Sequence, residues 1–222
     1  MQSMKQITAI AARRKGGGAA LERLLTRPLS PARIRKIPDD RWLSAMTKCV
    51  FQAGFNWQVI EDKWARFEEV FAGFDTHRWR MMSDDDLDRL LKEDGIVRNA
   101  AKLRSVRENA AFLDDMAEAH GSAGAYFATW QRGDYCRHLR ELQKGGSRLG
   151  GKTGQIFLRR MGVDTLVFSD DVIKALQREG IVDRMPGSNK DWRSLQDAID
   201  VWHGESGRTL NEISQILAFS VE

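Results

Sequence analysis

The sequence predicts an all-α protein, and three observations support this. Apolar residues recur at steps of three and four through most of residues 39–219, the spacing that places them on one face of a helix. Residues that favour helix N-caps, such as Ser83, Asn99 and Ser169, precede several of these runs. No stretch of useful length alternates apolar and polar residues as a half-buried strand does.

Residues 1–38 are expected to form a basic, flexible tail in front of one helical domain at residues 39–222. The stretch "RRKGGGAA" is rich in glycine, and Pro28, Pro31 and Pro38 interrupt the rest of the segment. Residues 1–36 contain nine Lys and Arg residues against one acidic residue, a net charge of +8. Such a tail either contacts a polyanion or only keeps the protein in solution.

The first helix of the domain is expected to begin at Asp39 or Asp40 and to reach Ala53. The second comes after Gly54, and its apolar face is expected to consist of Ile60, Trp64, Phe67, Phe71 and Phe74. The further helices are expected at residues 83–95, 99–121, within "GAYFATW" and "YCRHLRELQK", at 153–161 and 170–179, and twice within 189–220.

The composition is that of a soluble globular protein, with 42% hydrophobic and 30% charged residues. No apolar run approaches the ~18 residues of a membrane span, and the N-terminus has no apolar signal segment. Cys49 and Cys136 are the two cysteines, which favours a reduced, cytoplasmic protein and leaves too few thiols for a cysteine-rich zinc site.

The stretch "RLGGKTG", Arg148 to Gly154, has the features of a phosphate-binding turn. Its two adjacent glycines allow close backbone approach, and they precede a helix N-terminus with free N–H groups. It lies inside Trp130 to Gly162, where eight basic residues face two acidic ones, a net charge of +6. A simple interhelical turn is the alternative, but the surrounding charge favours a nucleic-acid backbone. The candidate contacts are Arg148, Gly150, Gly151, Lys152, Thr153 and Gly154.

Two other stretches allow both a structural and a functional interpretation. "FQAGFNW", Phe51 to Trp57, is either a helix end with core aromatics or the wall of a pocket for a flat ligand. Asp170 comes directly after the N-cap candidate Ser169, and its spacing alone favours helix capping. A carboxylate at that place could also stabilise a developing cation or activate water.

Several stretches resemble the 3-methyladenine DNA glycosylase I family of the helix-hairpin-helix glycosylase superfamily. They are "QAGFNWQVIEDKWARFEEVFAGFD", "LLKEDGIVRNAAKLRSVRENAAFL", "GGKTGQIFLRRMGV" and "SDDVI". The similarity covers roughly Asp39 to Leu176 and is strongest at Gln52–Trp57 and Gly95–Ala110. It implies an enzyme that flips an alkylated, 3-methyladenine-like purine out of double-stranded DNA and hydrolyses its N-glycosidic bond. The residues it implies are Asp170 for catalysis, Gln52, Phe55, Trp57, Trp130 and Cys49 for the base pocket, and residues 148–154 for the DNA-binding hairpin.

The chain departs from the family pattern in ways that leave its substrate open. Cys49 stands where the family has a glutamate that reads the base. The ligands of the family's zinc site are missing, so no zinc is expected, and the longer C-terminal helices are expected to hold the chain ends together. The superfamily implies a possible monovalent cation at the hairpin, and a monomer is expected. The alternatives are a catalytically inactive DNA-binding relative, a glycosylase for another lesion and, if the hairpin is buried, an RNA-binding or protein-interaction module.

Overall fold

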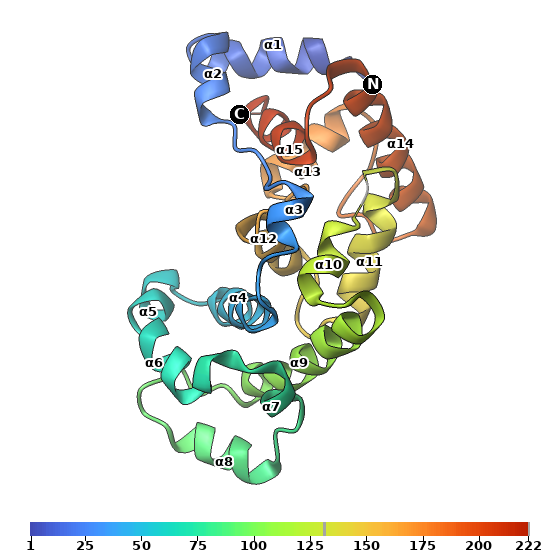
Figure 1. Ribbon diagram of the computed structural model, residues 1–222. Helices are drawn as coiled ribbons and strands as arrows, with labels where there is room; N and C mark the ends of the chain where they lie inside the picture. Colours follow the sequence, from blue (N-terminus) through green and yellow to red (C-terminus); the bar gives the residue numbers. More distant parts are fainter. Residues whose placement is uncertain (131, 222) are drawn as a thin grey trace. The chain divides into compact units, whose positions relative to one another are not determined.

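The computed structural model describes residues 1–130 and 132–221. Gln131, Glu222 and the side chain of Arg132, one of the eight basic residues between Trp130 and Gly162, lie outside this description. The described residues form helices joined by turns and loops, with no strand among them (Figure 1), so the predicted all-α class is confirmed. Within the same residues, no helix is long and apolar enough to cross a membrane.

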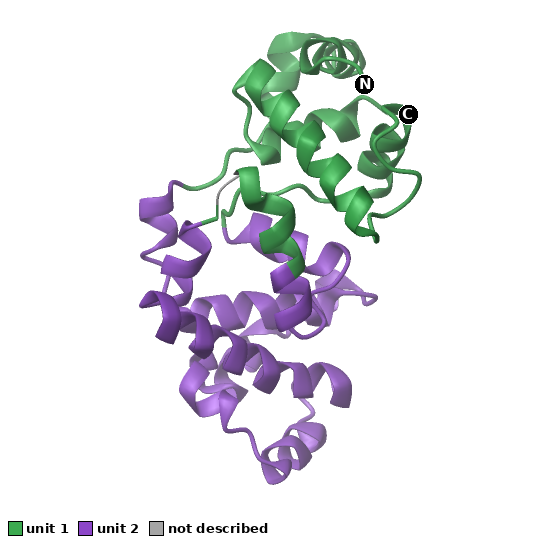
Figure 2. Cartoon of the chain, turned by 90° about the vertical axis from the view of Figure 1, so that its right-hand side faces the viewer, with its two compact units in different colours: residues 1–29, 130–140, 162–222 green, residues 30–129, 141–161 purple. Residues whose placement is uncertain are grey.

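The chain folds into two compact units, each assembled from segments that are distant in sequence (Figure 2). Unit 1 consists of residues 1–29, 130–140 and 162–222, and unit 2 of residues 30–129 and 141–161. The domain expected at residues 39–222 therefore contributes to both units.

Unit 1 brings the first and last helices of the chain together. It contains α1 (Met4–Arg14), α2 (Gly18–Leu24), η2 (Arg132–Asp134), the first part of α11 (Tyr135–Gly145), α13 (Asp170–Arg178), α14 (Asn189–Ser206) and α15 (Leu210–Phe219). α1 packs on α2, α14 and α15. The expectation that the C-terminal helices hold the chain ends together is confirmed by this packing.

The expectation of a flexible tail at residues 1–38 is wrong. Met4, Ile7 and Ala11 of α1 are fully buried, and Ser3 begins the helix with a capping box that involves Gln6. The steps of three and four between the buried residues are a helical stripe, which the glycines and basic residues around it concealed. The positive charge of this segment lies on folded helices.

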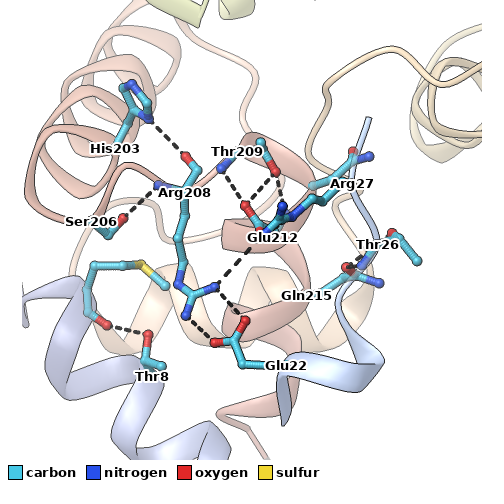
Figure 3. Close-up of polar contacts among 12 residues, drawn as sticks. Thr8, Glu22, Thr26, Arg27, His203, Ser206, Arg208, Thr209, Glu212 and Gln215 are labelled. Atoms are coloured by element: carbon cyan, nitrogen blue, oxygen red, sulfur yellow. Dashed lines mark hydrogen bonds and ion pairs between the residues drawn. The ribbon is translucent and has the colours of Figure 1, made fainter. Parts of the chain in front are cut away.

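Polar contacts fix α2 and the segment after it to the C-terminal helices (Figure 3). Nη2 of Arg208 donates to Oε1 of Glu22 at 2.5 Å, and Nη1 of Arg208 lies 3.8 Å from Oε1 of Glu212. Oε1 of Gln215 accepts a hydrogen bond from the backbone N–H of Thr26 at 2.8 Å. The hydrogen bond from Arg208 lowers the pKa of Glu22, so this carboxylate remains charged at neutral pH.

Unit 2 is organised around α9 (Ala100–His120), which packs on α4, α7, α8 and α10. Asn99 caps α9 at its start and Gly121 ends it in the left-handed conformation, as the sequence predicts. The other elements of unit 2 are α3 (Pro31–Ile34), α4 (Asp39–Gln52), α5 (Trp57–Asp62), α6 (Trp64–Val70), η1 (Ala72–Phe74), α7 (Thr76–Arg80), α8 (Asp84–Lys92), α10 (Ala123–Ala128), the last part of α11 and α12 (Lys152–Arg160).

The single helix expected from Gly54 to Phe74 is wrong, because the segment is divided at Lys63 and ends at Val70. The aromatic side chains still pack together, as their spacing suggests. The ring centroids of Trp64 and Phe67 lie 5.0 Å apart, and those of Trp64 and Phe74 lie 5.5 Å apart. Phe74 reaches this position with a φ of 64°, so aromatic packing prevails over a continuous helix.

Candidate functional site

The turn before α12 exposes the features of an anion-binding hairpin. Arg148 and Gly151 have φ values of 59° and 55°, which turn the backbone sharply ahead of the helix. Arg148, Gly150, Gly151 and Lys152 are exposed. α12 begins at Lys152, one residue earlier than expected, and no side chain caps it. The N–H of Thr153 donates to the carbonyl oxygen of Gly150 at 3.3 Å, and the helix dipole at this N-terminus favours an anion.

Glycine is required at Gly154 for this turn to pack closely. A Cβ atom at Gly154 would lie 2.4 Å from the carbonyl oxygen of Leu149, a distance that backbone atoms cannot accommodate. Leu149 itself is fully buried. The hairpin thus combines a buried anchor with an exposed turn. An RNA-binding or protein-interaction module is favoured only if the hairpin is buried. Because the turn is exposed, this alternative is not favoured.

α9 holds the hairpin through one buried amide. Nδ2 of Asn109 donates to the carbonyl oxygen of Ser147 at 3.1 Å, and Oδ1 of Asn109 accepts from the Ser147 N–H at 2.7 Å. Asn109 is fully buried, so the amide satisfies both partners away from water. Nε of Arg148 donates to the carbonyl oxygen of Ala101 at 3.3 Å, also on α9.

The same helix fixes the turn at the end of α4. Nζ of Lys102 donates to the carbonyl oxygens of Phe51 at 3.0 Å and Ala53 at 2.8 Å. These carbonyl groups belong to the C-terminal end of α4, where a cation is favoured by the helix dipole. Burial lowers the pKa of Lys102, and the charge of Arg148 lowers it further. α9 therefore positions both the hairpin and the stretch that leads to α5.

The stretch "FQAGFNW" divides between core and surface. Phe51 is fully buried, whereas Phe55 is 45% and Trp57 49% exposed. Oδ1 of Asn56 accepts from the N–H of Gln58 and caps α5. The core interpretation therefore holds for Phe51, and Trp57 is presented at the surface on the first residue of a helix.

Gln52 is buried beside this aromatic surface and has partners on both atoms of its amide. It is 1% exposed. Its Nε2 donates to Oε1 of Glu61 at 2.8 Å, and its Oε1 accepts from Arg160. Nζ of Lys48 lies 2.5 Å from Oε2 of Glu61, and the hydrogen bond from Lys48 lowers the pKa of Glu61. Glu61 is therefore an ionised carboxylate next to the buried amide.

Arg160, which the sequence pattern presents only as one basic residue among eight, joins this group from the last position of α12. The carbon at the centre of its guanidinium lies 4.7 Å from the centroid of the Trp57 ring. Its Nη1 lies 3.5 Å from Sγ of Cys49. Burial raises the pKa of the Cys49 thiol, so Cys49 is neutral where it meets Arg160. One sequence feature could have pointed to Arg160: it comes eight residues after Lys152, at the end of the short helix that begins at the hairpin.

Cys49, Gln52 and Trp57 are thus brought together in unit 2, with Phe55 on the same turn. The two remaining candidates lie in unit 1. Trp130 stacks on His138 with centroids 5.1 Å apart and an interplanar angle of 13°. Asp170 is exposed and opens α13, where Oγ of Ser169 accepts from the N–H of Val172. The predicted N-cap is confirmed.

Metal binding by side-chain clusters has no support among residues 1–130 and 132–221. No group of three or more His, Cys, Asp or Glu residues gathers there as a metal site. A monovalent cation at the hairpin would therefore depend on backbone carbonyl groups. The carbonyl oxygen of Leu149 is turned toward Gly154.

Comparison with known proteins gives one family and a related fold. The sequence model of methyladenine glycosylase matches residues 36–148, which include the stretch at Trp57 and all of α9 but end at the first residue of the hairpin. A 3-methyladenine DNA glycosylase I from Staphylococcus aureus, solved as a mutant, is 21% identical over 63% of this chain and 81% of its own, with a TM-score of 0.52. An 8-oxoguanine DNA glycosylase from Methanocaldococcus jannaschii is 15% identical over 95% of this chain and 91% of its own, with a TM-score of 0.54. At these identities the two structures show a shared fold.

Proposed function

The chain belongs to the methyladenine glycosylase family of DNA repair enzymes, and from this premise we propose that it excises an alkylated, 3-methyladenine-like purine from double-stranded DNA. Enzymes of this class hydrolyse the N-glycosidic bond. Since the target bond is inaccessible inside a duplex, the base has to leave the stack and enter a pocket. The protein therefore needs one site that binds the DNA backbone and one surface that binds the extruded base.

The strongest support for this proposal is that α9 contacts both the hairpin and the turn that presents Trp57. Asn109 fixes the exposed hairpin, and Lys102 fixes the turn that presents Trp57. The two residues are seven positions apart, so both anchors lie within about two turns of one helix. A backbone contact and a stacking surface held by one rigid helix have a defined separation, which base extrusion requires.

In the proposed reaction, the hairpin binds phosphates through its N–H groups and Lys152, and Trp57 stacks on the extruded base. Departure of the base builds positive charge on the sugar, and a carboxylate stabilises this charge or orients water. We assign that role to Asp170. Trp130 is the proposed second aromatic surface. The chain acts as a monomer in this proposal, with a monovalent cation bound by hairpin carbonyl groups where one is present.

Release of free base tests the proposed function directly. Purified protein incubated with duplex DNA that carries 3-methyladenine should release the base and leave an apurinic site, whereas undamaged duplex should release none. Boiled protein and a duplex with the lesion replaced by adenine serve as controls. Binding to the damaged duplex without any base release would identify the catalytically inactive relative instead.

Substitution Lys152→Ala tests the hairpin as a phosphate contact. Loss of one phosphate contact should weaken binding about equally on damaged and undamaged duplex and should reduce the slope of log affinity against log salt by ~1. Fluorescence anisotropy over a salt series measures both quantities.

The matched control is Lys92→Ala at the last residue of α8, which removes the same charge from unit 2 at an exposed position outside the hairpin. Its salt slope should equal that of the wild type. If Lys152→Ala leaves the slope unchanged, or if both variants lower it to the same extent, the hairpin is not the contact.

A further inference from the structure

The charged side chains linked to the buried amide of Gln52 do not sum to zero. Lys48 and Arg160 are cations, Glu61 is the one carboxylate bonded to this group among the described residues, and Cys49 is neutral. Lys48, Glu61 and Arg160 together therefore carry a net charge of +1 beside Gln52 and Cys49. An N3-alkylated adenine in DNA is itself a cation, and like charges in a partly dry site repel each other.

Arg160 is placed where it would meet an incoming base. Its guanidinium covers the exposed ring of Trp57 at 4.7 Å, and Nη1 is turned toward Cys49 and Gln52. Arg160 is itself exposed, and its guanidinium has further N–H groups besides Nη1. A guanidinium presents several donors in a plane and no acceptor. The matching partner is a base edge that carries acceptors only.

A neutral 6-oxopurine has that edge. Its O6 and N7 atoms both accept hydrogen bonds, and arginine binds this pair through two parallel N–H groups. Among damaged bases, hypoxanthine fits, since it is neutral and has O6 and N7 in this arrangement. Opposite thymine it forms a mispair, and extrusion costs least for a mispaired base. Guanine in a normal pair offers the same edge but remains stacked.

We infer that Arg160 gives this pocket a second activity, the excision of hypoxanthine from deaminated adenine, in addition to the proposed excision of an alkylated purine on which the inference rests. When the bond between C1′ and N9 breaks, its electron pair leaves with the base. A cationic base departs neutral, whereas hypoxanthine departs with negative charge spread to N7 and O6. Arg160 donates to those atoms and stabilises the charge.

The step balances with water as the co-reactant. Water adds its oxygen to C1′, one of its protons ends on the purine, and the products are free hypoxanthine and an apurinic sugar. Arg160 remains protonated throughout, because its role is to donate hydrogen bonds to the leaving base. Arg160 is therefore a specificity-determining residue. The proposed role of Asp170, stabilising the positive charge on the sugar, is separate from it.

Single-turnover release of base from two duplexes tests the inference. One duplex carries hypoxanthine opposite thymine and the other carries 3-methyladenine. The wild type should release both. Arg160→Gln should lower the ratio of hypoxanthine release to 3-methyladenine release by roughly 5- to 150-fold, the range of one lost bidentate contact, because the donors to O6 and N7 are lost and a charge that repels the cationic base is gone. Arg160→Lys keeps the charge without the planar pair of donors, so it should lower hypoxanthine release relative to 3-methyladenine release in the same direction as Arg160→Gln.

The outcomes separate the inference from the function on which it rests. Release of 3-methyladenine without hypoxanthine overturns the inference alone, and release of neither base overturns the proposed function as well. Equal losses on both duplexes in Arg160→Gln would assign Arg160 to packing and overturn its role in specificity. Thermal unfolding of each variant, together with binding to undamaged duplex, establishes that the compared proteins are folded.

Discussion

Replacement of Trp57 by alanine is expected to abolish most base recognition without unfolding the protein. Loss of one aromatic stacking partner costs about 1–3 kcal/mol per base, which corresponds to roughly 5- to 150-fold in single-turnover excision. Because the Trp57 side chain is 49% exposed, the loss of unfolding free energy should be well below the about 3–5 kcal/mol of a fully buried aromatic residue. Binding to undamaged duplex, which leaves the base in the stack, should be retained.

Phe51→Ala is the matched control, six residues earlier in the same stretch. Phe51 is fully buried, and its ring packs edge-on against Phe67 with centroids 4.9 Å apart. Its truncation should cost about 3–5 kcal/mol of stability. If Trp57→Ala instead shows such a loss in denaturant unfolding, with excision lost only through unfolding, then Trp57 is a structural residue and the pocket assignment fails.

The sequence predicts the helices of this fold well where local signals agree. Ser83 and Ser169 are N-caps, as their side chains suggest, and Gly121 ends α9. These features depend on residues within one turn of each other. The local helical period does not encode the break at Lys63, and the ring of Trp64 just after the break stacks on that of Phe74.

The N-terminal segment shows a second limit of the sequence. Its charge suggested a tail, but Glu22 and Thr26 find their partners about 190 residues later. A partner at that separation is visible only once the fold is known, and burial of Ile7 against the C-terminal helices results from the same assembly. Net charge is informative about ligands and solubility and says little about whether a segment folds.

The candidate site shows the same division between local and long-range information. Trp57, Gly150 and Gly151 are exposed, so the functional interpretation of both stretches stays a prediction that their local sequence suggests. The sequence does not single out Arg160, because its partners Cys49 and Gln52 are 111 and 108 residues away. Such long-range contacts give each side chain its own environment. Basic residues of one segment, such as Lys152 and Arg160, can therefore have different roles.

Asp170→Asn is expected to reduce base release by ~100-fold or more, about 2.7 kcal/mol of activation free energy. The physical reason is the positive charge that builds on the sugar as the base leaves, which an ionised carboxylate stabilises and an amide does not. Binding to damaged duplex and thermal stability should be retained, because the substitution preserves shape and Ser169 continues to cap α13. Single-turnover excision on the lesion that the protein releases fastest measures the effect.

Asp171→Asn is the internal control for this assignment. Asp171 is the next residue on the same helix turn and points about 100° away around the axis, and its Oδ1 lies 3.6 Å from Nζ of Lys174. If both aspartates only favour the helix N-terminus, each substitution should cost a similar, small amount of stability, within about 0.3–1 kcal/mol, and activity should vary with the folded fraction. Equal, small losses of excision from the two variants would remove Asp170 from the mechanism and leave an enzyme that acts by extruding and holding a base whose bond is already labile.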